Sequence, residues 1–224
     1  MLNFKGRMIP ETLEEVLDPK HTVLVIHDMQ NDPCNPESVQ SKMVGTYNCD
    51  RIMGKLLKLR DAARKAGVRV MYTQYTNQPD YQSVGDYSIY HDREFVGDPK
   101  NPNPVTNVVN TWGWEIVNEL KPAPNEVSVL KYRIDCFVGT NFDNILRTNH
   151  IKTIVSSGIA LEVGIDATAR TAILKDYFVV VPRDVVAGRQ QEYCDETMTW
   201  LERSVIVKNM DEITKVWESS KKSM

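Results

Sequence analysis

The stretch that most directly indicates the fold reads Thr22-Val23-Leu24-Val25-Ile26-His27-Asp28. Its first five residues are apolar or β-branched, and no polar side chain alternates with them. A half-exposed strand alternates polar and apolar residues, whereas a strand covered on both faces is apolar throughout. We therefore predict a buried strand over residues 22–26 that ends at His27 and Asp28.

The rest of the chain alternates short β-branched runs with longer amphipathic stretches. Further strands are expected at 68–73, 127–130, 153–156, 178–181 and 205–207. Helices are expected at 51–66, 112–120, 141–149, 162–176, 195–202 and 211–218. Strands that alternate with helices form a parallel sheet covered on both faces. The fold class is therefore α/β, and the absence of repeats and linkers predicts one domain over residues 1–224.

One long segment interrupts this alternation. From Asn77 to Asn110 the sequence is rich in Pro, Asp, Tyr, Asn and Gly and shows no clear period. A loop of this length in a compact domain is usually functional or mobile. We interpret residues 77–110 as a lid or substrate-specificity loop, with a plain surface excursion as the alternative.

The composition excludes several classes of partner. The chain has 27 Lys and Arg against 30 Asp and Glu, a net charge of −3, so neither nucleic acid nor an anionic membrane is expected to bind. No apolar run approaches the ~20 residues that span a bilayer, and the N-terminus lacks the apolar core of a signal peptide. The four cysteines are scattered and expected to be reduced, which favours a cytoplasmic location: Cys34, Cys49, Cys136 and Cys194.

Three polar or glycine-rich positions follow strand ends, where ligands bind in open parallel sheets. Asp28 follows the first strand, Lys131 follows residues 127–130, and Gly158 begins a turn after residues 153–156. A carboxylate beside a cation can carry acid–base chemistry, although a buried structural ion pair is an equally good interpretation. The turn at 158–170 leads into a helix, and unpaired N–H groups at a helix start attract negative charge.

Three blocks of sequence together resemble the isochorismatase-like hydrolase superfamily. Residues 25–32 (VIHDMQND) resemble its opening signature, and residues 131–142 (KYRIDCFVGTNF) resemble its lysine block. Residues 158–172 resemble the block in which many members carry a cysteine nucleophile. The blocks occur in the family's order, and the resemblance covers roughly residues 20–210.

The resemblance implies a three-layer α/β/α fold with a central parallel sheet of about six strands, and a homodimer or homotetramer. It also implies a pocket around Asp28 and Lys131 that binds a small-molecule substrate. In members that split C–N bonds, a cysteine attacks the carbonyl, the aspartate takes its proton, and two backbone N–H groups hold the oxyanion. Matched residue by residue, the cysteine position is Gly164, the donors are Ala160 and Gly164, and a cis peptide is expected at Ile159–Ala160.

Gly164 is the departure from this pattern, because glycine has no side chain that can attack a carbonyl. The enzymes that name the superfamily also have glycine here and cleave an enol ether, with the aspartate as general acid. The leading hypothesis is therefore a hydrolase of a small metabolite that uses Asp28 and Lys131 as acid and base without a cysteine, by enol-ether hydrolysis or a related reaction. The alternatives are a C–N amidohydrolase whose cysteine is replaced by Gly164, and a catalytically silent member that binds a ligand or joins an assembly.

Other residues are weaker candidates. The resemblance suggests substrate contacts for Phe137 and Tyr75, and Glu162 either contacts substrate or water or caps a helix. Cys136 is interpreted as a small buried residue, with a substitute nucleophile as the alternative. Arg133 is interpreted as a structural ion-pair partner, with contact to an anionic substrate as the alternative. The Asp-x-His metal ligands of the nicotinamidase branch are missing after the second strand, so neither a metal nor another cofactor is expected.

Overall fold

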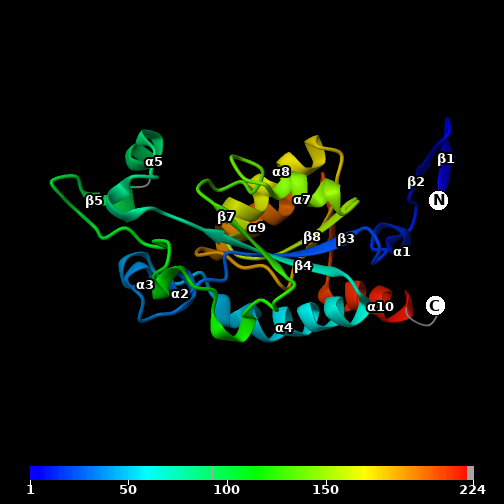
Figure 1. The fold of residues 1–224 in the computed structure, drawn as a ribbon, viewed down its shortest axis with the longest axis horizontal. Coiled ribbons are helices and arrows are strands. Elements are labelled where there is room, and N and C mark those ends of the chain that lie inside the picture. Colours follow the sequence, from blue (N-terminus) through cyan, green and yellow to red (C-terminus); the bar gives the residue numbers. More distant parts are fainter. Residues whose placement is uncertain (92, 221–224) are drawn as a thin grey trace.

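A six-stranded parallel sheet forms the centre of the molecule (Figure 1). In this computed structural model, residues 1–91 and 93–220 are described; Asp92 and residues 221–224, which the expected domain also includes, lie outside them. The strand order is β10-β9-β8-β3-β4-β7, and every neighbouring pair is parallel. The strands are β3 (Thr22–His27), β4 (Arg69–Tyr75), β7 (Val127–Lys131), β8 (Thr153–Gly158), β9 (Phe178–Pro182) and β10 (Ile206–Lys208). The predicted α/β fold and its six strands are confirmed.

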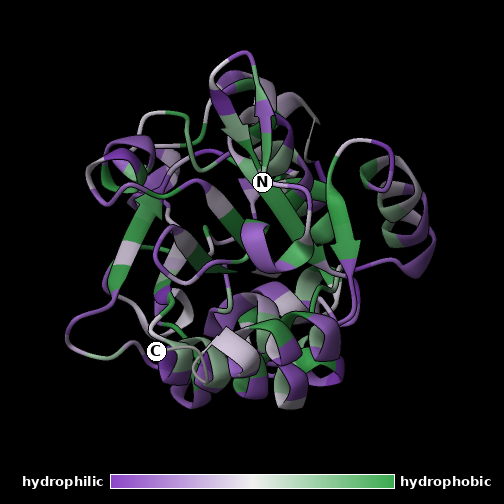
Figure 2. Cartoon of the chain, turned by 90° about the vertical axis from the view of Figure 1, so that its right-hand side faces the viewer, coloured by the Kyte–Doolittle hydropathy of each residue, from purple (hydrophilic) through white to green (hydrophobic). Residues whose placement is uncertain are grey.

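Helices cover both faces of the sheet. α4 (Cys49–Ala66) and α10 (Met210–Ser220) lie below it in Figure 1, and α7 (Phe142–Thr148), α8 (Asp166–Leu174) and α9 (Gln191–Leu201) lie above it. β3 is buried throughout and serves both layers: Leu24 and Ile26 pack into the core below, while Val23 and Val25 pack into the core above. Figure 2 shows the apolar strands enclosed by helices that are polar on their outer sides.

The expected helix over residues 112–120 is wrong. The structure has two single 3₁₀ turns there, η2 (Trp112–Trp114) and η3 (Asn118–Leu120), separated by an extended Glu115. The carbonyl of Trp114 accepts hydrogen bonds from the side chains of Gln30 and Gln74, at 2.8 and 3.0 Å. These side chains compete for a carbonyl that a helix would have used, so the backbone stays extended here.

The helix expected over 162–176 is also modified. It begins with a π-helical turn, η4 (Leu161–Ile165), before α8, and it ends at Leu174. π turns inside helices occur frequently at functional sites. The irregular turn lies directly after β8, at the edge of the sheet where ligands are expected.

Several short elements were not expected. The N-terminus forms a hairpin of β1 (Leu2–Phe4) and β2 (Arg7–Ile9), followed by α1 (Leu13–Val16); α2 (Asn31–Cys34) and α3 (Val39–Val44) follow β3. The hairpin and α2–α3 lie at opposite ends of the molecule in Figure 1.

The 77–110 segment contains η1 (Pro79–Tyr81), α5 (Asp86–His91), α6 (Arg93–Val96), β5 (Gly97–Asp98) and β6 (Asn101–Pro102). It projects beyond the carboxyl ends of the strands, at the left of Figure 1. Its two ends are joined, because Asn77 N–H donates to Asn107 O at 2.9 Å and Val109 N–H donates to Asn77 O at 3.0 Å. The segment is therefore a closed excursion from the sheet.

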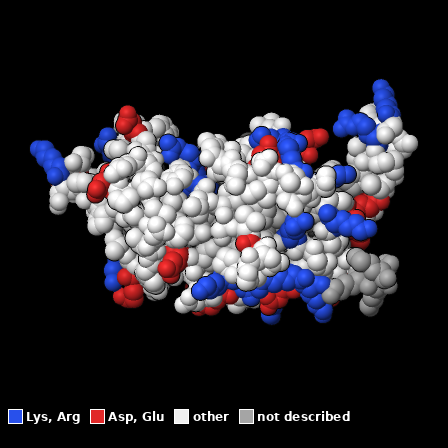
Figure 3. Space-filling view, viewed as in Figure 1, with Lys and Arg blue, Asp and Glu red and all other residues white. Residues whose placement is uncertain are grey.

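Basic and acidic side chains are mixed on the face of the molecule shown in Figure 3. On the face shown in Figure 3, basic and acidic residues intermingle along the lower edge and at the two ends. Within residues 1–91 and 93–220, no helix is long and apolar enough to cross a membrane.

Candidate active site

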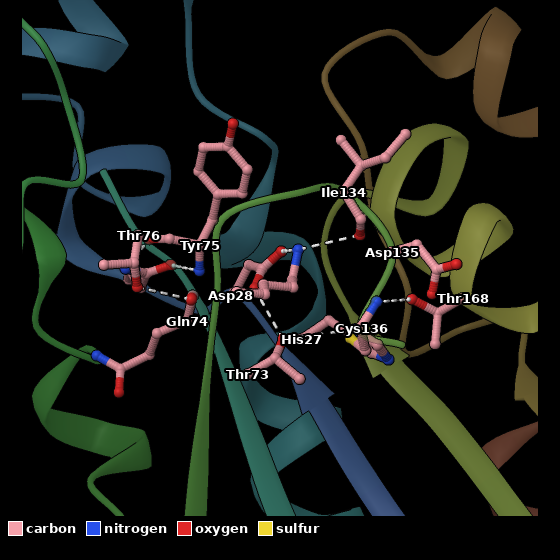
Figure 4. Close-up of polar contacts among 12 residues, drawn as sticks. His27, Asp28, Thr73, Gln74, Tyr75, Thr76, Ile134, Asp135, Cys136 and Thr168 are labelled. Carbon is pink, nitrogen blue, oxygen red and sulfur yellow. Dashed lines mark hydrogen bonds and ion pairs between the residues drawn. The ribbon is translucent and has the colours of Figure 1, made fainter. Parts of the chain in front are cut away.

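The sheet brings Asp28 and Lys131 together at its carboxyl edge. Asp28 follows β3, Lys131 ends β7, and β4 lies between these two strands. Asp28 Oδ2 and Lys131 Nζ are 2.6 Å apart, and the Lys131 side chain is only 1% exposed. Lys131 Nζ also donates to Ile134 O at 3.2 Å (Figure 4). The sequence-based expectation that these two residues meet is therefore correct.

Thr73, at the end of β4, fixes the position of Asp28. The Thr73 hydroxyl donates to Asp28 Oδ1 at 2.7 Å, and the Asp28 N–H donates to Thr73 O at 3.1 Å (Figure 4). Asp28 has a φ of +51°, a left-handed conformation that non-glycine residues rarely adopt. These contacts hold one carboxylate oxygen on Thr73 and leave Oδ2 facing Lys131.

Lys131 carries a charge in a buried place. Burial alone would lower the pKa of Lys131, but the negative charge of Asp28 and its hydrogen bond outweigh this, and the pKa is raised above its usual value. The ammonium is therefore present at neutral pH and can stabilise negative charge next to Asp28.

Gly164 faces this ion pair from η4. A Cβ atom built on Gly164 would lie 3.3 Å from Ile134 O, 3.4 Å from Lys131 Nζ and 3.5 Å from Asp28 Oδ2. A side chain at residue 164 would thus point between the carboxylate and the ammonium. Residue 164, which matches the nucleophile position of the family, therefore faces Asp28, which can take a proton, and Lys131, which can stabilise negative charge.

The turn after β8 approaches β3 closely. Gly158 has a φ of +99°, and a Cβ there would lie 2.4 Å from His27 O, so only glycine fits. The following Ile159–Ala160 peptide bond is cis, as expected. No described residue accepts a hydrogen bond from the Ala160 N–H, whereas the neighbouring Ile159 and Leu161 N–H groups bond to His27 O and Ala187 O. The Ala160 N–H is therefore available to a ligand oxygen.

A cavity of about 230 Å³ opens above the ion pair. Asp28, Lys131, Ala160, Gly164 and Tyr75 line it, so the structure brings these five candidates together. The ring of Tyr75 lies 5.3 Å from Lys131 Nζ. The cavity walls also include residues from α2, α3 and the 77–110 segment: Pro33, Gln40, Asn77, Tyr81, Val84, Ser88, Phe95, Val96, Pro104, Val105, Thr106 and Asn107.

Two residues that the sequence suggested as substrate contacts, Phe137 and Glu162, do not line the cavity. Phe137 packs against Phe142 and Tyr177 instead; its N–H donates to Asp135 Oδ1 in the turn after β7. The Glu162 carboxylate accepts a hydrogen bond from the Arg189 N–H at 3.0 Å and neither caps its helix nor lines the cavity.

Two further residues are also outside the cavity. Arg133 donates to the carbonyls of Ser83 and Tyr132, and these backbone bonds to described residues take the place of the expected ion pair. Cys136 is fully buried, and burial raises the pKa of its thiol to about 12, as suits a small core residue.

His27 is a buried residue that sequence reasoning missed. Its Nε2 lies 2.9 Å from Ser156 Oγ, and its Nδ1 lies 3.5 Å from Thr73 Oγ1 and 3.6 Å from Cys136 Sγ. Burial lowers the pKa of His27 to about 4; Asp28 opposes this effect and Lys131 adds to it. A neutral His27 imidazole therefore lies next to the Thr73 hydroxyl, which in turn donates to the Asp28 carboxylate.

We expect stability to depend on pH through His27. The unfolded chain binds a proton below its ordinary pKa near 6.5, whereas folded His27 stays neutral to about pH 4. Stability from this group is thus complete above pH 6.5 and declines by up to about 3 kcal/mol as the pH falls to 4. Urea unfolding of the chain and of His27→Gln at pH 7, 5.5 and 4.5 measures this. Equal acid sensitivity in both proteins would assign the effect to other groups.

No group of three or more His, Cys, Asp or Glu side chains that could hold a metal ion occurs in the described parts of the chain.

Comparison with known proteins adds an independent line of evidence. The family model described as Isochorismatase domain matches residues 22–208. Ureidoacrylate amidohydrolase RutB of Rhizobium rhizogenes is 31% identical over 175 residues, which make up 75% of this chain and 71% of the relative. A cysteine hydrolase from Pseudomonas syringae has a TM-score of 0.74 at 22% identity, covering 90% of this chain and 94% of that one. An isochorismatase-like hydrolase from Alkaliphilus metalliredigens has a TM-score of 0.75 at 21% identity, covering 88% and 99%.

Proposed function

The chain belongs to the isochorismatase family of hydrolases, and on that basis we propose that it hydrolyses a C–N bond of a small amide or ureide with water as the nucleophile. The bond type is taken from the relatives named amidohydrolases. The observation that carries the proposal is the direction of Gly164, whose missing side chain would point between Asp28 and Lys131. A water molecule in the space that a longer side chain at residue 164 would reach would find polar partners nearby in Asp28 Oδ2, Lys131 Nζ and Ile134 O.

In the proposed reaction, Asp28 acts first as a base and then as an acid. Water attacks the substrate carbonyl and gives its proton to Asp28 Oδ2. The carbonyl oxygen becomes an oxyanion near the Ala160 N–H, which donates to no described residue and can donate to the oxyanion. When the C–N bond breaks, the proton on Asp28 passes to the leaving nitrogen. Lys131 stabilises the negative charge in both steps, and Thr73 keeps Asp28 in place.

Enol-ether hydrolysis is the second candidate, because Gly164 matches the glycine of the enzymes that name the superfamily. In that reaction Asp28 would protonate the enol-ether carbon, and water would complete the cleavage. A turnover panel of simple amides, ureides and isochorismate separates the two candidates. Hydrolysis of an amide or ureide supports the first, hydrolysis of isochorismate alone supports the second, and tight binding without turnover would indicate a silent ligand-binding member.

We expect Gly164→Cys to gain a covalent route. The new thiol would lie beside Lys131, whose charge favours the thiolate, and beside Asp28, which can take its proton. Incubation with a small activated ester or amide should produce an acyl adduct on the introduced thiol, which intact-protein and peptide mass spectrometry detect. The native thiols of Cys136 and Cys194 are buried with pKa values raised to about 12, so they should not react.

The matched control is Gly164→Ala, which adds the same Cβ atom without a thiol. This control should fold, form no adduct and lose activity if the Cβ displaces the attacking water. An adduct that formed equally on the unaltered chain, or none on Gly164→Cys despite normal folding, would contradict the proposed geometry.

A further inference from the structure

The charged groups of the cavity are already paired with each other. Among the described residues that line it, the only charged side chains are Asp28 and Lys131. These two groups lie 2.6 Å apart, so their charges offset each other. Among the described residues that line the cavity, none offers an unpaired cation to a bound substrate.

Basic residues near the cavity have other partners. Arg133 donates to the carbonyls of Ser83 and Tyr132 at 3.0 and 2.6 Å. Arg189 pairs with Glu94 at 2.7 Å. Neither arginine lines the cavity, so neither supplies a positive charge to a bound ligand.

The wall opposite the ion pair is neutral and mostly apolar. The 77–110 segment contributes the side chains of Tyr81, Val84, Phe95, Val96 and Val105. The Tyr81 hydroxyl is engaged by Asn103 O at 2.6 Å, which leaves its ring as the available surface.

The polar residues of this wall, Asn77, Ser88, Thr106, Asn107 and Gln40, carry no charge, and two of them form a pair of carboxamides. Asn107 Nδ2 donates to Gln40 Oε1 at 2.7 Å, and both side chains are at least 95% buried. The pair is held by Asp32, which accepts the Asn107 N–H through its carboxylate and the Ser38 and Ser41 hydroxyls through its carbonyl.

We infer that the substrate is an uncharged amide or ureide whose remainder is apolar, and that it carries no carboxylate at the end opposite the scissile bond. This inference rests on the proposed function for the position of the scissile group. Burying a carboxylate without a cationic partner costs far more than burying a hydrocarbon of the same shape. The substrate class therefore differs from ureidoacrylate, the anion named for the relatives.

Two probes of one shape test this. 3-Ureidopropanoate and (3-methylbutyl)urea share the ureido group and linker, and the carboxylate of the first is replaced by an isopropyl group in the second. Isothermal titration on the full chain should give (3-methylbutyl)urea at least about tenfold tighter binding. Equal or tighter binding of 3-ureidopropanoate, or binding of neither probe, would overturn the inference.

A charge added to the apolar wall should reverse the preference. Compared with the unaltered chain, Val105→Arg should bind 3-ureidopropanoate at least about tenfold more tightly. The same variant should bind (3-methylbutyl)urea less tightly. Val105→Gln, a neutral polar control, should not gain carboxylate binding. Val84→Arg repeats the test from a second lining position. Failure of both arginine variants to gain carboxylate binding, with normal folding, would also overturn the inference.

Binding and turnover are read separately. If (3-methylbutyl)urea binds selectively but no amide or ureide is hydrolysed, the proposed reaction is wrong while the inferred substrate character stands. If ureides are hydrolysed but the carboxylate probe is preferred, the reaction stands and the inferred substrate character is wrong.

Discussion

Replacing Asp28 by asparagine should lower kcat on the hydrolysed substrate by about 10²–10⁴-fold, the usual contribution of positioned proton transfer. Asparagine keeps the size of the side chain and can still accept the Thr73 hydroxyl bond. It cannot take a proton from water or return it to a leaving group. KM should change far less, because the lost interaction belongs mainly to the transition state. Steady-state kinetics with circular dichroism as a folding check measures both.

Asp135→Asn is the matched control for this variant. Asp135 lies in the turn after β7, accepts hydrogen bonds from the Phe137 N–H and the Thr171 hydroxyl, and does not line the cavity. Asparagine keeps one acceptor oxygen at this position outside the cavity, so its introduction should leave kcat within about threefold. An Asp28→Asn protein with undiminished kcat would place the chemistry elsewhere.

Replacing Lys131 by methionine should produce the largest loss of stability. Methionine fills a similar volume, but it leaves the Asp28 carboxylate partly buried beside no cation. Breaking a buried ion pair in this way typically costs about 3–5 kcal/mol. For a domain of this size that corresponds to a fall in Tm of roughly 6–20 °C. Activity should be lost as well, since no positive charge would face the oxyanion.

The double variant Asp28→Asn/Lys131→Met separates charge from packing. Removing both charges eliminates the unpaired carboxylate, so the double variant should be more stable than Lys131→Met alone. Urea unfolding of the four proteins in this cycle gives the coupling energy directly. A double variant that is as unstable as the sum of its singles would mean that the pair contributes no coupling to the fold.

The sheet could be predicted because its strands are continuous apolar runs. β3 is buried throughout and β9 is buried after Phe178, and both are rich in β-branched residues without an alternating polar pattern. The proximity of Asp28 and Lys131 followed from the same reasoning, since parallel strands end at one edge. The direction of Gly164 also agreed with its place in the third sequence block.

What could not be predicted depends on side chains that act across the fold. The 112–120 region looked helical, yet Gln30 and Gln74 hold the Trp114 carbonyl in an extended segment. Phe137 lies in a recognised block, but sequence spacing does not reveal that its ring turns toward Phe142. His27 sits at the end of an apolar run, where nothing in the sequence indicates that it supports Thr73. The expected homo-oligomer and cytoplasmic location stay predictions.

The joined ends of the 77–110 segment also have a consequence for how this scaffold can change. Because Asn77 is hydrogen-bonded to Asn107 and Val109, the segment leaves the body of the molecule and returns to it at one place. The closure entropy of such a loop rises slowly, by about 0.6 kcal/mol for each doubling of length. A graft of different length or composition at residues 78–106 loses contacts such as Arg133 with Ser83 O and Arg189 with Glu94, but it leaves both ends of the segment paired. We therefore expect such a graft to reshape the far wall of the cavity while Asp28, Lys131 and Gly164 keep their places.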